Sequence, residues 1–181
     1  MSKPDFKEIF FSTFKSESAG IHYSVRSDSN FQHDIHFLDS LLKDSRFLLG
    51  HIKHTKQTLV IPLTRARWEL RDEVTQHNLV EIESELKFTR VKKLQWIAKN
   101  VTLSAPYEGN LFEPGDAITD STRCEIDSLF IGESTYIGKN RSVEIVIAGY
   151  PGRWQLRVSL ALESWSISVK DNKVPPMISV S

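Results

Sequence analysis

The stretch that decides the fold is VEIVIAGYPGRWQLRVSLAL, residues 143 to 162. Apolar and polar residues alternate through it, which is the pattern of strands with one buried face. Pro151 and Gly152 between its two halves are a favoured turn pair. The two halves are therefore predicted to form an antiparallel hairpin, with these apolar pairs facing each other: Ile147 with Leu156, Ile145 with Val158, and Val143 with Leu160.

The alternation inverts beyond Leu162, because the next apolar residues are Trp165, Ile167 and Val169. This inversion predicts a bulge or a sharp bend near Glu163 and Ser164. A strand that changes faces in this way suits the corner of a sandwich or a barrel.

Other extended runs have the same period of two and cover about 46 to 53, 58 to 71, 79 to 90 and 124 to 131. Residues 104 to 123 are rich in Pro, Gly, Asp, Ser and Thr, so they are predicted to be a long connection. Cys124 alternates with Ile126 and Ser128, which predicts a small buried residue more than a nucleophile.

Two runs, 58 to 71 and 79 to 90, are predicted to form a second hairpin in which even-numbered residues face even-numbered ones. One face would then hold Trp68, Leu70, Val80 and Ile82. The other face would place arginines among glutamates, namely Arg65, Arg67 and Arg71 among Glu81, Glu83 and Glu85. Cross-strand pairs of this kind contribute about 0.2–1 kcal/mol each.

Two helices are expected near the N-terminus. Pro4 and Asp5 suit a first turn, and the apolar residues that follow recur at helical spacing, which predicts a helix within residues 1–20. Residues 31–43 have apolar residues at helical spacing, with Asn30 placed to cap the first turn.

These elements predict an α+β, mainly antiparallel β protein, whose bent sheet forms a sandwich or partial barrel with two short N-terminal helices. The whole chain, 1–181, is expected to be a single domain. Residues 45–169 would be mostly antiparallel strands. The segment 170–181 contains adjacent prolines and is predicted to be an extended tail.

Composition disfavours some partners. Lys plus Arg number 23 and Asp plus Glu number 23, so no net charge attracts nucleic acid or an anionic membrane. The single cysteine fits a reducing compartment, and no apolar window approaches the ~18 residues of a membrane helix. We therefore predict a cytoplasmic protein that binds neither nucleic acid nor membrane.

A histidine-rich segment, FQHDIHFLDSLLKDSRFLLGHIKH at residues 31 to 54, raises the question of a metal site. His33, His36 and Asp39 are close on the predicted helix surface, but Lys43 shares that surface and repels a cation. A third ligand would come from elsewhere, with His22 or His77 as candidates. The prediction is no metal, and a site at His33, His36 and Asp39 is the alternative.

Two further groups are candidate binding residues. Arg65, Arg67 and Arg71 could bind an anion, although the opposing glutamates compete for them. The turn GYPGRW places Tyr150, Arg153 and Trp154 at a hairpin tip, and these residue types are enriched at binding hot spots. The alternative is an aromatic pair that clamps the hairpin.

No nucleotide, dinucleotide, zinc-protease or serine-hydrolase motif is present in the sequence. We therefore predict a non-catalytic binding or protein-interaction module with no cofactor. Its partner would be a protein or a small-molecule ligand, and a homodimer is one arrangement that the phenylalanine-rich N-terminus favours. The alternative is a hydrolase or metal-dependent enzyme that uses His33 and His36 with loop carboxylates.

Overall fold

The computed structural model describes residues 20–67, 81–98, 101–105, 122–133, 142–151 and 153–172, and for residues 101–105 it describes the backbone alone. Within these residues the chain is mainly antiparallel β-sheet, as predicted. One α-helix, α2 (Phe31–Leu42), and a short 3-10 helix, η1 (Leu49–His51), accompany the sheet.

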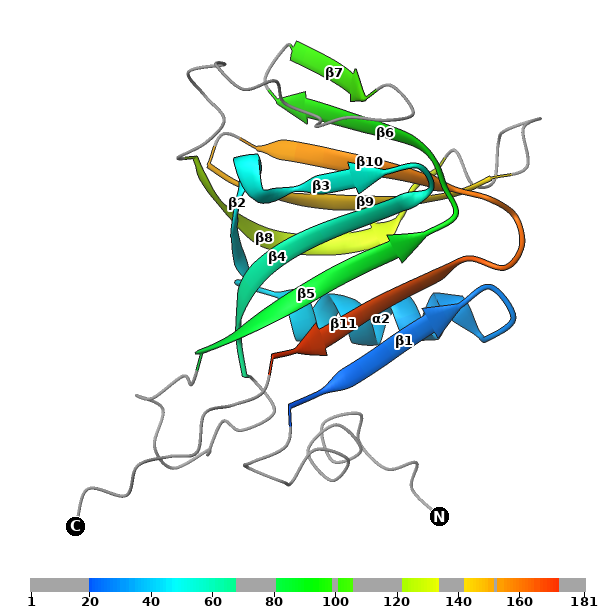
Figure 1. Ribbon diagram of the computed structural model, residues 1–181, viewed down its shortest axis with the longest axis horizontal. Helices are drawn as coiled ribbons and strands as arrows, with labels where there is room; N and C mark the ends of the chain where they lie inside the picture. The colour runs from blue at the N-terminus through cyan, green and yellow to red at the C-terminus, as the bar shows by residue number, and fades with distance from the viewer. Residues whose placement is uncertain are drawn as a thin grey trace.

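The described strands form one sheet, whose path is β1-β11-β5-β4-β2-β8-β9-β10-β6-β7, with β3 paired to β4 beside that path (Figure 1). β1 and β7 end the order, so the sheet does not close. The strand bounds are β1 (His22–Arg26), β2 (Arg46–Leu48), β3 (Lys53–Thr55), β4 (Thr58–Ala66), β5 (Glu81–Thr89), β6 (Val91–Ala98), β7 (Val101–Ala105), β8 (Arg123–Ile131), β9 (Val143–Tyr150), β10 (Trp154–Leu160) and β11 (Ser166–Asp171).

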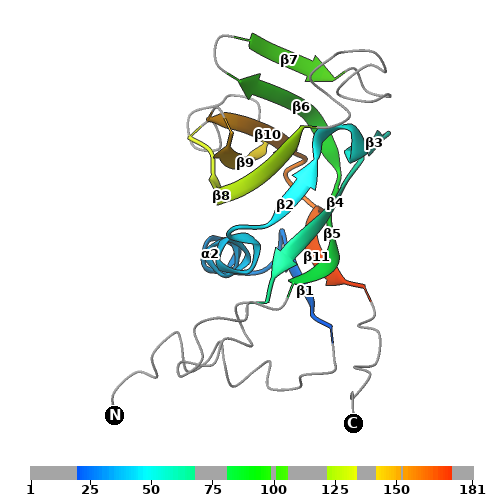
Figure 2. The same cartoon turned by 90° about the vertical axis from the view of Figure 1, so that its left-hand side faces the viewer.

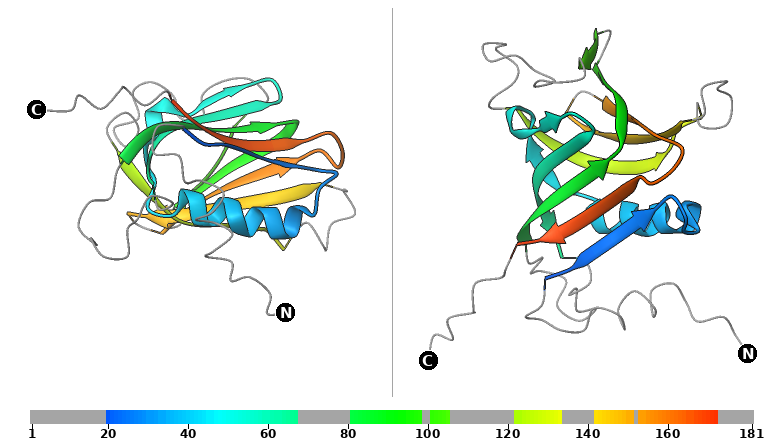
Figure 3. Two further views of the ribbon diagram at one scale, coloured as in Figure 1. Left: turned by 90° about the horizontal axis from the view of Figure 1, so that it is seen from below. Right: turned by 45° about the vertical axis from the view of Figure 1, so that its right-hand side comes forward.

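The sheet is strongly bent at β2, which links two halves that lie at an angle to each other (Figure 2). One half contains β1, β11, β5 and β4, and the other contains β8, β9, β10 and β6. Apolar side chains from both halves form one buried cluster. α2 contacts β8, β1 and β4, so it joins the two halves on one side (Figure 3).

The predicted helix at residues 31–43 is confirmed as α2, which ends at Leu42 with Lys43 as its C-cap. Its buried residues recur at helical spacing and are Ile35, Leu38, Leu41 and Leu42. Asn30 is the N-cap, but its side chain makes no capping hydrogen bond. Its backbone carbonyl accepts hydrogen bonds from the N–H groups of His33 and Asp34 instead. α2 has 12 residues, and no helix in the described part of the chain is long and apolar enough to cross a membrane.

The hairpin predicted from residues 143–162 is confirmed with its register. β9 and β10 pair so that Ile147 faces Leu156, Ile145 faces Val158 and Val143 faces Leu160. The predicted bend is also present, because β10 ends at Leu160 and Ser164 has a φ of 60°. β11 then pairs with β1 and β5 in the other half of the sheet. The bend therefore carries the chain from one half to the other.

The register predicted for the second hairpin is wrong. In β4 and β5, Leu59 faces Phe88 and Arg65 faces Ile82, so odd-numbered residues face even-numbered ones. The core side of this pair therefore contains Leu59, Ile61, Leu63, Ile82, Leu86 and Phe88. A shift of one residue moves every side chain to the other face, and this longer apolar stripe determines the register. The arginine ladder facing glutamates is therefore absent from these two strands.

The two ends of the chain test the sequence predictions only in part. The helix predicted within residues 1–20 and residues 173–181 of the predicted tail lie outside the described residues. The tail prediction began too early, because Lys170 and Asp171 belong to β11. Of the two predicted helices, the described residues contain the second.

Candidate functional site

The sheet splits along one edge of β4. Thr64 of β4 pairs with Arg46 of β2, whereas residues 58–60 pair with β3. Pro62 lies between these two pairings, and a proline has no backbone N–H to donate to a neighbouring strand. The position of Pro62 therefore fits the point along β4 where the neighbouring strand changes from β3 to β2.

A groove of about 470 Å³ lies at this split, and we call it the β2 groove. Its lining comes from β2, η1, the middle of β4, the start of β5 and the first residue of β8. Asn172, the residue after β11, also lines it. Among the described residues, five ionisable side chains line it, and they are Arg46, His51, Glu81, Glu83 and Arg123.

Two of these side chains neutralise each other. The Arg46 guanidinium forms an ion pair with the Glu81 carboxylate, and both side chains are partly exposed. Exposed ion pairs contribute about 0–1 kcal/mol, because water screens the charges. A partner could therefore replace this contact at little cost.

The other three ionisable side chains of the groove are available to a partner. His51, Glu83 and Arg123 are exposed, and the described residues offer no hydrogen bond or ion pair to their side chains. Glu83 lies on β5, whereas Arg123 lies on β8, across β2 and β4 in the strand order. The β2 groove thus carries charges of both signs on separate strands, without partners in the described part of the chain.

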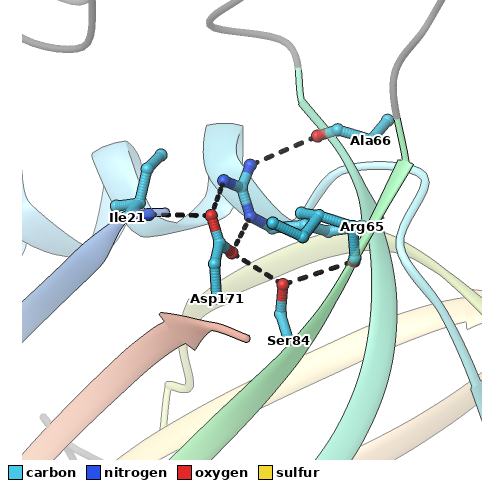
Figure 4. Close-up of polar contacts among 6 residues, drawn as sticks. Ile21, Arg65, Ala66, Ser84 and Asp171 are labelled. Atoms are coloured by element: carbon cyan, nitrogen blue, oxygen red, sulfur yellow. Dashed lines mark hydrogen bonds and ion pairs between the residues drawn. The ribbon is translucent and has the colours of Figure 1, made fainter. Parts of the chain in front are cut away.

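A buried ion pair lies beside the groove (Figure 4). Arg65 donates from Nε to Asp171 Oδ1 at 2.7 Å and from Nη2 to Asp171 Oδ2 at 2.6 Å. Asp171 also accepts hydrogen bonds from the Ser84 hydroxyl at 2.7 Å and from the Ile21 N–H at 2.8 Å. Arg65 Nη1 donates to the carbonyl of Ala66 at 3.3 Å. Both partners of the ion pair are thus well supplied with hydrogen bonds.

The charged form of Asp171 is favoured in this setting. Burial raises the pKa of its carboxyl, but the hydrogen bonds from Arg65, Ile21 and Ser84, together with the Arg65 charge, outweigh burial. The pKa of Asp171 therefore lies below its ordinary value, and the pair is ionised at neutral pH.

This network fixes one wall of the groove. It joins β4, β5 and β11 to the residue before β1, and Ser84 belongs both to it and to the groove lining. The N–H of Asn172 donates to the carbonyl of Glu83 at 2.8 Å. Because these strands are tied together, the backbone that carries Glu83 is held in place.

Two of the three arginines proposed as an anion site are in the protein interior. Arg65 and Arg67 are buried, with 0% and 2% of their surface exposed, and Arg71 lies outside the described residues. Asp171 occupies the Arg65 fork, so the carboxylate that this arginine binds belongs to the protein itself. The sequence offered no local signal for this pair, because Asp171 is distant in the chain.

The residues proposed as an alternative metal site have different surroundings. His33 and His36 are exposed on α2, and His33 Nδ1 lies 3.9 Å from Asp34 Oδ1. Asp39 instead accepts a hydrogen bond from the N–H of Leu129 on β8 at 2.6 Å, and burial raises its pKa. His22 is exposed on β1, and His77 lies outside the described residues. Among the residues described, no group of three or more His, Cys, Asp or Glu side chains could hold a metal.

The turn residues proposed for recognition have different surroundings. Trp154 is 1% exposed, stacks on Trp96 with ring centroids 4.9 Å apart, and meets the edge of Phe47. Its Nε1 donates to the carbonyl of Tyr150 at 2.9 Å. Trp154 is thus placed to clamp the hairpin. The binding role proposed for Tyr150, which is 53% exposed, and for Arg153, which is also exposed, stays a prediction.

Two observations agree with the expectation for Cys124. Its side chain is buried at 1% exposure, and burial raises the pKa of its thiol to about 12. A thiol with that pKa is not ionised at neutral pH, so it lacks the thiolate that a nucleophile needs.

The β2 groove and the buried His54 are features that the sequence patterns did not predict. Arg46 and Arg123 come from distant parts of the chain, and Pro62 inside an apolar run was the one local signal that β4 changes partners there. His54 of β3 is buried at 5% exposure, and neither ring nitrogen has a hydrogen-bond partner in the described structure.

A second hollow, of about 610 Å³, lies between residues 26–28 and residues 162–166. The N–H of Ser164 donates to the Ser27 hydroxyl at 3.0 Å, which links the two turns that form it. Its charged residues lie in or beside these turns, whereas those of the β2 groove lie mainly on paired strands. The β2 groove is the better candidate because the backbone of most of its charged residues belongs to paired strands.

Comparison with protein-family models, with curated proteins and with solved structures finds no significant match to this chain. A function for this chain is therefore inferred from the β2 groove and its surroundings.

Proposed function

We propose that this chain is a non-catalytic interaction module that binds a segment of a partner protein in the β2 groove. The observation that carries the proposal is a pair of opposite charges on separate strands of this groove, Arg123 and Glu83, to which the described residues offer no partner. A partner segment with one acidic and one basic side chain would match both.

The chemistry of the lining supports a protein segment over a small apolar ligand. Small-molecule sites are mostly apolar with few polar groups, whereas five ionisable residues line the β2 groove. Arginine is enriched at protein interfaces, because its planar fork binds carboxylates at two points. Two arginines in one groove fit this kind of partner.

Charge reversal tests the proposal. The purified chain would be probed against an array of ten-residue peptides that vary in the number and spacing of Asp and Lys. We expect the wild-type chain to select peptides that contain both charges. Arg123→Glu and Glu83→Lys should each weaken selected peptides at least tenfold, the size of a lost charge-assisted contact of about 1.4 kcal/mol or more.

Lys92→Glu is the matched control, since Lys92 is exposed on β6 and does not line the groove. This variant should keep the wild-type peptide preference. A preference that is identical in wild type, Arg123→Glu and Glu83→Lys would refute binding in the β2 groove. A second copy of this chain is one candidate partner, and light scattering of the wild-type chain and Arg123→Glu would reveal a dimer that uses the groove.

A further inference from the structure

His54 is an unusual residue for a protein interior. It is 5% exposed, and neither Nδ1 nor Nε2 finds a hydrogen-bond partner among the described residues. Nearly all buried polar side chains of native proteins are hydrogen-bonded, and each exception calls for an explanation. The neutral imidazole is tolerated here, but a charged one would be strongly disfavoured.

The surroundings of His54 are apolar. It pairs with Leu59 of β4, and Leu59 in turn pairs with Phe88 of β5, both fully buried. In the strand register, the charged residues nearest to His54 are the exposed cations Lys53, Lys56, Lys87 and Arg90. The carboxylates of β5 (Glu81, Glu83 and Glu85) pair further along β4, with Ala66, Thr64 and Pro62, and the buried Arg65 lies at that same end. Burial lowers the pKa of His54. Among the described strands β3, β4 and β5, no carboxylate lies beside His54 in the register to stabilise the protonated ring.

We propose that His54 is a proton-sensitive latch that holds β3 on β4 when neutral and releases it when protonated. In the closed state the uncharged ring packs in the interior. In the open state the ring lies in water, takes up one proton from the solvent and becomes a cation. Acid thus favours the open state through the hydration of the charged ring.

β3 is suited to local release. It has three residues, and its pairing in the described sheet is with β4 alone, beside the main strand path. Short strands with one partner open at lower free energy than strands paired on both edges. β9, which pairs with both β8 and β10, is the opposite case.

The latch bears on the β2 groove, so this regulatory role rests on the proposed function. β3 directly follows η1, whose His51 lines the groove, and the N–H of Ile52 donates to the carbonyl of Leu49 at 3.2 Å. When β3 separates from β4, the segment that contains η1 and His51 loses its attachment to the sheet on that side. Partner binding in the β2 groove is therefore expected to weaken as the pH falls below about 6.5, the ordinary pKa of histidine.

Hydrogen exchange of the full chain, followed by NMR without any ligand, tests the latch. Protection of the amides of residues 53–60 would be compared at pH 7.5 and 5.0, after correction for the intrinsic effect of pH on exchange. Because an exposed histidine has a pKa of about 6.5, opening should increase about thirtyfold at pH 5.0. The amides of β9 and β10 should keep their protection.

Two substitutions remove the titrating ring. His54→Leu and His54→Gln should each abolish the acid response of residues 53–60, and either one suffices if the other fails to fold. His51→Gln is the control, because His51 is exposed and close in sequence, and this variant should keep the response.

Some results would overturn the latch. These are wild-type protection at residues 53–60 that is independent of pH, a response that survives both His54 substitutions, or equal loss of protection in β9 and β10. No peptide is present, so a failure of the β2 groove to bind peptides leaves this result unchanged. The two proposals can therefore fail separately.

Discussion

Arg65 and Asp171 meet inside the protein as a two-point ion pair, although 106 positions separate them in the chain. Both side chains are fully shielded from solvent. Burying such a pair removes the hydration of two charges, and the ion pair and its hydrogen bonds compensate for that loss. Each charge is therefore tolerated in the interior only while its partner is present. Removal of both partners should therefore cost less stability than the sum of the two single removals.

Single substitutions should be strongly destabilising. Asp171→Leu leaves the Arg65 guanidinium buried without its carboxylate, and it also removes the acceptor for Ser84 and for the N–H of Ile21. We expect a loss of about 3–5 kcal/mol in the free energy of unfolding, measured by urea denaturation. Arg65→Met should give a loss of similar size, because it leaves Asp171 buried and charged.

The double variant Arg65→Met with Asp171→Leu is the control for this prediction. With no buried charge left, it should be at least about 1 kcal/mol more stable than the sum of the two single losses would give. If the losses simply add, the two residues do not act as a pair.

The same network makes stability depend on acid. The pKa of Asp171 lies below its ordinary value, so the folded state binds fewer protons than the unfolded state. Its contribution is complete above the ordinary pKa of 3.8 and is lost as the pH falls through the lower pKa of the folded state. Urea denaturation from pH 7 to pH 2 should therefore show a loss below about pH 4 that is smaller in the double variant.

His54 adds a second acid-dependent range at higher pH. Its pKa is lowered by burial, so the folded state again binds fewer protons than the unfolded one. Stability from the neutral ring is complete above about pH 6.5 and falls below it, by at most about 1.4 kcal/mol per pH unit. Urea denaturation between pH 8 and pH 5 should show this decline in wild type. A decline of equal slope in His54→Leu would assign it to other groups.

The hairpin of β9 and β10 was predictable because its information is local. A turn pair and two alternating runs lie within residues 143–160, and one register alone places the apolar residues on a common face. For β4 and β5, the apolar residues Trp68 and Leu70 at the end of the run predict a register in which even-numbered residues face each other. The stripe from Leu59 to Leu63, with Leu86 and Phe88 opposite, determines the register instead.

The candidate site could not be predicted from local patterns in the sequence. The β2 groove brings together β2, β5 and β8, and no spacing rule in the sequence places Arg46, Glu83 and Arg123 around one groove. Arg65 has the appearance of a surface residue until Asp171 is known to meet it. The groove and the buried ion pair both depend on which distant residues meet in the fold. The periodicity of a single sequence does not show these contacts.

Trp154 offers a test of clamp against recognition. It is buried against Trp96 and Phe47, so Trp154→Ala should cost about 3–5 kcal/mol of unfolding free energy, measured by urea denaturation. Tyr150→Ala is the control, because this exposed side chain should contribute within about 0.5 kcal/mol. A Trp154→Ala variant of wild-type stability would contradict the clamp.

Two glycines on the same half of the sheet should respond differently to a methyl group. A Cβ at Gly149 would overlap the backbone carbonyl oxygen of Glu125 on the neighbouring strand and lie 2.8 Å from Cζ2 of Trp154. Backbone in a paired strand cannot move aside without breaking the β8–β9 pairing. Gly149→Ala should therefore destabilise the fold by about 1–3 kcal/mol, the usual range for overpacking, as measured by urea denaturation.

Gly132→Ala is the matched control, since its Cβ would also overlap a neighbour, but that neighbour is the carboxylate end of the Glu144 side chain. A side chain can rotate away, and the loss of chain entropy in the unfolded state offsets about 0.4–1 kcal/mol of any remaining cost. Gly132→Ala should thus fall within about 1 kcal/mol of wild type. Equal losses for both variants would mean that the backbone contact between Gly149 and Glu125 does not limit how closely β8 and β9 approach.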